Sequence, residues 1–141
     1  MASKSGIGLL QLPVELESIR LGRPVDLLLD AKVRRVLGFV VLCGDDSLRF
    51  LAHAAAEVQE GAITVPSALL LLEDVEFYRA RSGSLRALLG ASVAANGREV
   101  GVLHDVVVGR DGSLESLLVA REGAVHEVEP AGVRIELAPA A

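Results

Sequence analysis

Residues 36–51 read VLGFVVLCGDDSLRFL, and residues 102–117 read VLHDVVVGRDGSLESL. When the second stretch is placed 66 positions after the first (102 minus 36), eight of the 16 aligned residues are identical. Valine-rich strands resemble one another by chance, so the shared Asp-x-Ser-Leu turn and an upstream Leu-Gly-x-x-Val match carry most of the weight. A second match, of Leu21–Val25 with Leu89–Val93, extends the similarity upstream. The chain is therefore predicted to contain an internal duplication.

The second copy shows its strands most clearly. The dipeptide Asn96-Gly97 is typical of a two-residue hairpin turn, which requires positive φ at both positions. Strands are predicted over 99–108, 113–121, 125–129 and 133–137, separated by turns rich in Gly, Pro and Asp. Short strands, tight turns and almost no helical periodicity predict an all-β protein built from small closed or nearly closed barrels.

The strand predicted over 36–43 is apolar on both of its faces. A strand that is buried on both faces needs cover on both sides, and one side can pack within its own barrel. The second body is either the other copy or another subunit, so a homodimer stays open. Leu37, Phe39, Val41 and Cys43 in this strand are the candidate interaction or dimer surface.

Three segments organise the chain. Residues 1–72 are predicted to form the first barrel-like unit, 73–83 a linker, and 84–141 the second unit. Pro66 and Ser84 each predict the start of a short helical turn, the second ending at Gly90. The linker is expected to be partly helical and anchored by Phe77 and Tyr78.

The residues LLGASV (88–93), NGREVGVLHDVVV (96–108) and the turn at 110–112 resemble the PRC-barrel family, named for the photosynthetic reaction-centre H subunit. The first copy keeps Leu21–Val25 and the Val65-Pro66 step, whereas residues 27–33 depart from the pattern. The resemblance implies two tandem SH3-like barrels packed together. It also implies a non-enzymatic protein–protein interaction or scaffold module, and it contributes no catalytic residue.

Composition restricts the partners. The 141 residues carry a net charge of −5, which disfavours direct binding to nucleic acid or anionic lipid. Half of the residues (51%) are hydrophobic, which excludes intrinsic disorder. A single cysteine, Cys43, fits a reducing cytoplasmic compartment. The uncharged stretch 61–72 is too short for a membrane-spanning helix, so no membrane insertion is expected.

The reactive side chains form no catalytic or metal-binding pattern in the sequence. We predict that His104 is a hydrogen-bonded core residue, that His53 lies on a rim, and that His126 faces away from Glu127. Asp45 is expected to serve its turn through local backbone bonding rather than acid–base chemistry. No catalytic, cofactor or metal site is therefore predicted, and the chain is not expected to be an enzyme.

Two other functions stay open. By resemblance to ribosome-maturation factors, the chain is alternatively a ribosome- or RNA-processing accessory that docks a ribosomal protein. It is otherwise a small-ligand binder. Interaction with an unidentified protein partner is the leading interpretation.

Overall fold

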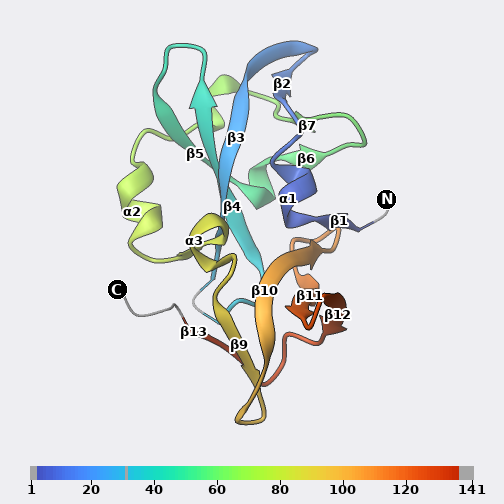
Figure 1. The fold of residues 1–141 in the computed structure, drawn as a ribbon. Helices are drawn as coiled ribbons and strands as arrows, with labels where there is room; N and C mark the ends of the chain where they lie inside the picture. The colour runs from blue at the N-terminus through green and yellow to red at the C-terminus, as the bar shows by residue number, and fades with distance from the viewer. Residues whose placement is uncertain (1–2, 31, 137–141) are drawn as a thin grey trace.

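The computed structural model describes residues 3–30 and 32–136, which form two β-sheets with a few short helices (Figure 1). The elements are, in chain order, β1 (Lys4–Ser5), α1 (Gly6–Leu9), β2 (Val14–Leu16), β3 (Ile19–Leu29), β4 (Val36–Cys43), β5 (Leu48–Ala52), η1 (His53–Ala55), β6 (Glu57–Val58), β7 (Ile63–Thr64), η2 (Ala68–Leu70), α2 (Val75–Arg79), β8 (Gly83–Ser84), α3 (Leu85–Leu88), β9 (Ser92–Ala95), β10 (Arg98–Val108), β11 (Leu114–Arg121), β12 (Ala124–Val128) and β13 (Val133–Glu136). Within the described residues, no helix has the length and apolarity needed to cross a membrane.

The first sheet has the strand order β5-β4-β3-β2-β7-β6, and β8 also pairs with β3. The second sheet has the order β12-β11-β10-β9-β13, and β1 also pairs with β10. All pairings are antiparallel except that of β2 with β7. The all-β class is confirmed. Among residues 3–30 and 32–136, however, the pairings close neither sheet into a barrel, so the predicted closed barrels are not confirmed.

A series of six elements occurs twice along the chain, in the same order each time. We call β1, α1 and β2–β5 the first repeat, and β8, α3 and β9–β12 the second repeat. In each repeat a two-residue turn with positive φ, Glu17-Ser18 or Asn96-Gly97, leads into an 11-residue strand. A Cβ atom added to Gly22 in β3 or to Gly101 in β10 would lie 2.4 Å from a carbonyl oxygen of the neighbouring strand. The two long strands are therefore structural counterparts.

This correspondence corrects the predicted register. The sequence match superimposes β4 on β10, whereas the structural counterpart of β10 is β3, which begins 79 residues earlier (98 minus 19). Leu21–Val25 lies inside β3, while Leu89–Val93 runs from the end of α3 into β9, so that second match was wrong. The shared Asp-x-Ser sequence forms the turn between β4 and β5 in the first repeat and the turn between β10 and β11 in the second. These two hairpins are not equivalent in the fold, so the sequence match reflects the same kind of turn at two different places.

The leading segment of each repeat crosses to the other sheet. β1 pairs with β10 of the second repeat, and β8 pairs with β3 of the first. In Figure 1, α1 accordingly lies beside β10, while α3 lies beside β3 and β4. The predicted unit boundaries at residues 72 and 84 therefore do not separate the two sheets completely. The N-terminal strand of each repeat pairs with a strand of the other repeat's sheet.

A buried aspartate carboxylate accepts hydrogen bonds from each crossing segment. Asp105 accepts a hydrogen bond from the backbone N–H of Ile7 (3.0 Å), at the start of α1. Asp26 accepts one from the backbone N–H of Arg86 (3.2 Å) in α3, and another from the hydroxyl of Ser84. Each carboxylate also accepts the N–H of the residue that follows it, at 2.7 and 2.8 Å. Both aspartates are buried, so these bonds satisfy groups that water cannot reach.

The repeats also meet at their centres. The N–H of Val36 donates to the carbonyl of Gly112 (2.7 Å), and the N–H of Leu114 donates to the carbonyl of Arg34 (2.8 Å). One hydrophobic core is continuous across both sheets, and its fully buried members include Leu9, Leu27, Phe39, Leu51, Leu85, Leu103 and Leu117. The chain folds as one body around this core.

We expect Asp26→Ala to lower the free energy of unfolding by about 3 kcal/mol, because buried donors lose their acceptor. Asp26→Asn retains one acceptor oxygen and should cost less than half as much. Urea denaturation of both variants measures the difference. Equal losses for the two variants would show that packing, rather than acceptance of hydrogen bonds, gives Asp26 its importance.

Candidate interaction surface

The four residues predicted to offer a surface do not lie together on one. Phe39 and Val41 are fully buried, so they belong to the core and present nothing to a partner. Leu37 is 36% exposed, at an irregularity in the pairing of β3 with β4. Cys43 is half-buried, and burial raises the pKa of its thiol, although the positive charge of Arg49 opposes that rise. Exposed apolar surface is found elsewhere on the chain.

Both faces of β4 are buried, as predicted, but the prediction of what covers the outer face was wrong. Phe39 and Val41 face the core that is shared by the two repeats. Val40, on the other face, packs in a separate cluster with Phe50, Val75 and Tyr78. Val75 and Tyr78 belong to α2, so a helix of the linker covers this outer face, rather than the second copy or another subunit.

The cover is an aromatic stack. The rings of Tyr78 and Phe50 lie 3.9 Å apart between centroids and only 9° from parallel. The neighbouring Phe77 is 45% exposed, and the guanidinium of Arg81 lies 3.7 Å from its ring centroid. The anchoring role expected of both aromatic residues therefore falls to Tyr78.

We predict that Tyr78→Ala lowers the free energy of unfolding by about 2 kcal/mol, since it removes the stacked cover from Phe50. Phe77→Ala, the adjacent control, should cost less than about 1 kcal/mol because that ring is largely solvent-exposed. Chemical denaturation compares the two variants. A loss from Phe77→Ala as large as that from Tyr78→Ala would contradict the assignment of the cover to Tyr78.

Asp45 and Asp111 form matching turns. Asp45 accepts hydrogen bonds from the N–H (3.1 Å) and hydroxyl (2.5 Å) of Ser47, and Asp111 accepts the same pair from Ser113, at 3.0 and 2.6 Å. These bonds hold the pKa of both carboxyl groups below the usual range. Both carboxylates stabilise their own turns, as the sequence predicted for Asp45.

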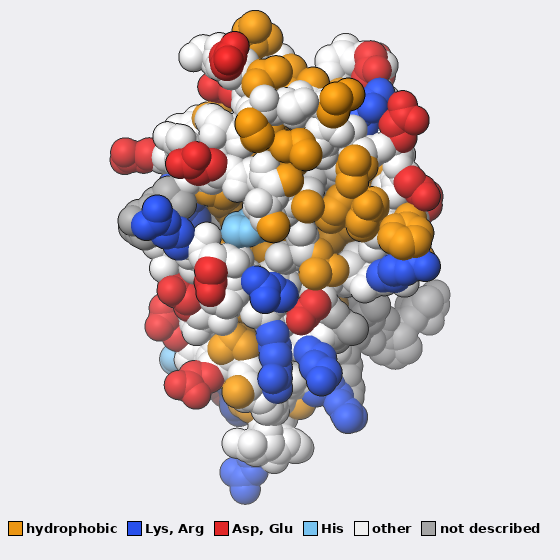
Figure 2. Space-filling model, turned by 180° about the vertical axis from the view of Figure 1, so that it is seen from behind, with side chains coloured by type: hydrophobic (Ala, Val, Ile, Leu, Met, Phe, Trp, Pro, Cys, Tyr) orange, Lys and Arg blue, Asp and Glu red, His pale blue; other side chains and the backbone are white. Residues whose placement is uncertain are grey.

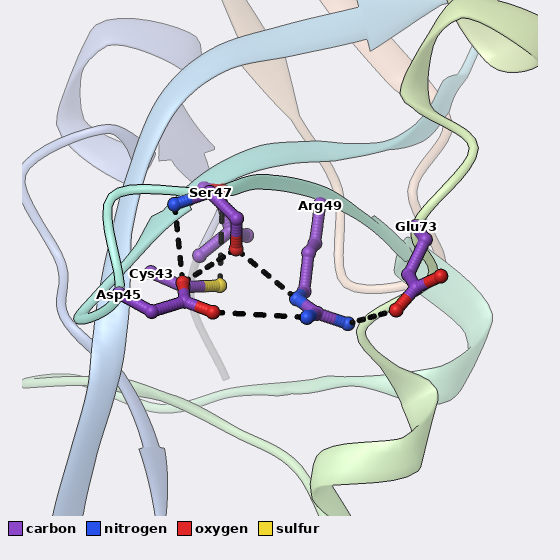
Figure 3. A network of polar contacts seen from close by, with 6 residues as sticks. Cys43, Asp45, Ser47, Arg49 and Glu73 are labelled. Carbon is purple, nitrogen blue, oxygen red and sulfur yellow. Dashed lines mark hydrogen bonds and ion pairs between the residues drawn. The ribbon is translucent and has the colours of Figure 1, made fainter.

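Arg49 extends the first of these turns toward α2. Its guanidinium lies 3.8 Å from the Asp45 carboxylate and 3.5 Å from that of Glu73, while its Nε donates to the Ser47 hydroxyl (Figure 3). The acidic partners are largely exposed, and exposed ion pairs of this kind contribute little stability. The network links the turn between β4 and β5 to Glu73, just before α2, and it resembles no catalytic arrangement.

The three histidines are dispersed. His104 is exposed, so its predicted core position was wrong. The pairing of β10 with β11 shifts between Leu103 and Asp105, and this irregularity changes which residues face inward. His126 is also exposed. Within the described chain, no group of three or more His, Cys, Asp or Glu side chains is arranged to hold a metal ion.

His53 lies at the contact between the repeats, half-buried at the end of β5. Its ring centroid is 6.2 Å from that of Phe39, and a Cβ atom added to Gly112 would lie 2.8 Å from its Nδ1. Burial lowers the pKa of His53, the charge of Arg35 lowers it further, and Asp111 opposes both. The imidazole is therefore favoured in its neutral form.

This environment predicts a pH dependence. The unfolded histidine has a pKa of about 6.5 and the folded one a lower value, so the unfolded chain binds more protons in mild acid. The stabilising contribution is complete above about pH 6.5 and is lost as the pH falls toward the folded pKa. We expect His53→Gln to reduce the loss of stability between about pH 7.5 and pH 5.5, measured by urea denaturation. His126→Gln is the exposed control, and an unchanged profile for His53→Gln would refute the assignment.

The outer face of the second sheet is the exposed apolar surface that sequence reasoning missed. Val102 is 39% and Val125 49% exposed, and they flank Ala120 across three strands. Leu118 and Val107 continue this face and are half-buried. Figure 1 shows α2 beside the first sheet, whereas no helix of the described chain lies beyond β11 and β12. The sequence indicates this surface only weakly. Most residues of β11 are apolar, so its sequence does not show which face of the strand is covered.

A second surface is basic. Lys32, Arg34 and Arg134 line a groove of about 320 Å³ together with Val33 and Pro130. Seen from behind, Lys and Arg side chains gather over the lower part of the molecule, while hydrophobic side chains gather above them (Figure 2). Among the ion pairs of the described residues, which involve Arg49 and Arg79, none includes these three cations.

Comparison with known proteins assigns no relative to the chain. No protein-family model matches its sequence, and a search of curated proteins finds no match.

Proposed function

We propose that the chain is a non-enzymatic protein–protein interaction module in which each repeat is a PRC-type unit. The observation that supports this function is the unequal covering of two equivalent sheet faces. α2 covers Val40 and Phe50 on the outer face of the first sheet, where they are 0% and 3% exposed. Their counterparts on the second sheet, Leu118 and Glu127, are half-buried and exposed, and Val102 and Val125 on the same face are 39% and 49% exposed. Exposed apolar side chains on a sheet face are favourable places for a partner to bury surface.

A photo-crosslinking amino acid placed at position 125 tests this function. The full-length protein, introduced into a lysate of its native host, should form one defined crosslinked product with another protein. A crosslinker at position 19 is the matched control, because Ile19 is also exposed, at 65%, on β3. Ribosomal proteins in the product would support the alternative role as a ribosome-associated accessory.

The proposed function is wrong if position 125 yields no crosslinked protein, or only the products that the control position also yields. A bound metabolite detected by native mass spectrometry would then support the small-ligand alternative.

A second candidate, binding of a small anionic ligand, is favoured by the groove of Lys32, Arg34 and Arg134. Three cations around one hollow attract carboxylate or phosphate groups. Titration with citrate and with inorganic phosphate, followed by backbone NMR, would detect this activity through shifts at these residues. Chemical-shift changes of equal size at other exposed arginines, such as Arg20 and Arg98, would show that the ions bind nonspecifically.

A further inference from the structure

The first repeat contains a segment that shows how such a sheet face is covered. Leu72 pairs with Phe50 at the free edge of β5, through two backbone hydrogen bonds of 2.8 Å. The chain then turns into α2, which places Val75 and Tyr78 over the outer face. One extended residue on the strand edge followed by a five-residue helix is therefore enough to bury Val40 and Phe50.

The same positions in the second repeat are open. Phe50 pairs with Val40, and its counterpart Glu127 pairs with Leu118 in the same way. Glu127 is exposed and Leu118 half-buried, whereas Phe50 and Val40 are 3% and 0% exposed. Among the described residues, β12 pairs only with β11, so the edge that Leu72 occupies on β5 has no counterpart on β12.

We propose that this edge and face bind a segment of a partner protein that adopts the conformation of residues 72–79: one extended residue on β12, followed by a short amphipathic helix over Leu118. The inference rests on the proposed interaction function and specifies the partner. This binding mode combines two known ways of recognising a peptide: pairing with the free edge of a strand, and packing of an amphipathic helix on an apolar surface.

Charge specifies the partner further. Where Tyr78 stacks on Phe50 in the first repeat, the second repeat presents the carboxylate of Glu127. Glu122 and Glu129 add negative charge near β12, and Arg121 is the one cation of residues 121–129. The partner helix therefore carries Lys or Arg at the position of Tyr78. This acidic rim opposes both an anionic membrane and a second copy docked through the same acidic edge.

Peptides test the proposal directly. The probe is a synthetic peptide of residues 70–82 with Tyr78→Arg, titrated into the full-length protein and followed by backbone NMR. We expect saturable shifts at Leu118, Val125 and Glu127. Short helices are marginal in water, so millimolar peptide is required. The Tyr78→Glu peptide is the charge-reversed control and should bind about threefold more weakly or worse.

Two protein variants keep the test decisive. Glu127→Phe should reverse the preference, so that the peptide with native Tyr78 binds about threefold more tightly than the Tyr78→Arg peptide, because the aromatic stack is recreated. Leu118→Glu should abolish binding. Since Leu118 is half-buried, Leu118→Ala is the second variant, and it should weaken binding about tenfold because it keeps only a small apolar side chain at the centre of the covered face. Leu69→Glu, at an 87% exposed residue on η2, is the control and should change nothing.

The outcomes separate the inference from the proposed function. Absence of shifts on β11 and β12, or equal binding of all three peptides to both the native and Glu127→Phe proteins, overturns the inference. If position 125 still crosslinks to a defined protein, the interaction function survives without this binding mode. If no protein crosslinks either, both fail. Dimerisation that is lost in Val125→Glu would assign the face to a second copy and overturn the inference as well.

Discussion

Two buried aspartates determine how the repeats are joined. Each carboxylate accepts one backbone N–H from the first turn of a short helix that arrives from the other repeat: Asp105 accepts that of Ile7, and Asp26 accepts that of Arg86. A buried carboxylate without donors would be strongly destabilising, and so would the helix N–H groups without an acceptor. Each group therefore requires the other, and the requirement is met only when the leading segments have crossed. The sheets consequently cannot form their complete hydrogen-bonding pattern independently.

The crossing explains why one continuous core serves both sheets, and why the linker between the repeats lies where it does. After the first repeat the chain must travel to β8 on the first sheet before entering the second, and α2 lies along that route over Phe50 and Val40. The second repeat is followed by β13 instead, which pairs with β9 at the other end of the sheet. The unequal covering of the two faces, which supports the proposed function, thus follows from the chain order.

Much of the local structure could be predicted from the sequence, because turn and cap chemistry is local. Asn96-Gly97 forms its turn, and Ser84 caps α3 by accepting the N–H of Ala87. The double-sided burial of β4 was also evident from its composition. Register was not, because the Asp-x-Ser turn recurs at two different hairpins of the fold. His104 was misplaced by a strand irregularity that leaves no mark in an alternating pattern. The candidate site depends on which faces long-range packing leaves open, and no local pattern records that.

Native-state hydrogen exchange provides the most direct test of the joined architecture. If the crossing segments unite the repeats, the protected amides of β4 and β11 should open with the same free energy, and the N–H groups of Ile7 and Arg86 should exchange in the same cooperative step. Urea should lower all of these opening energies together. Exchange of the second sheet at a markedly lower free energy, with β4 still protected, would mean that the repeats are independent domains and that the two aspartates do not unite them.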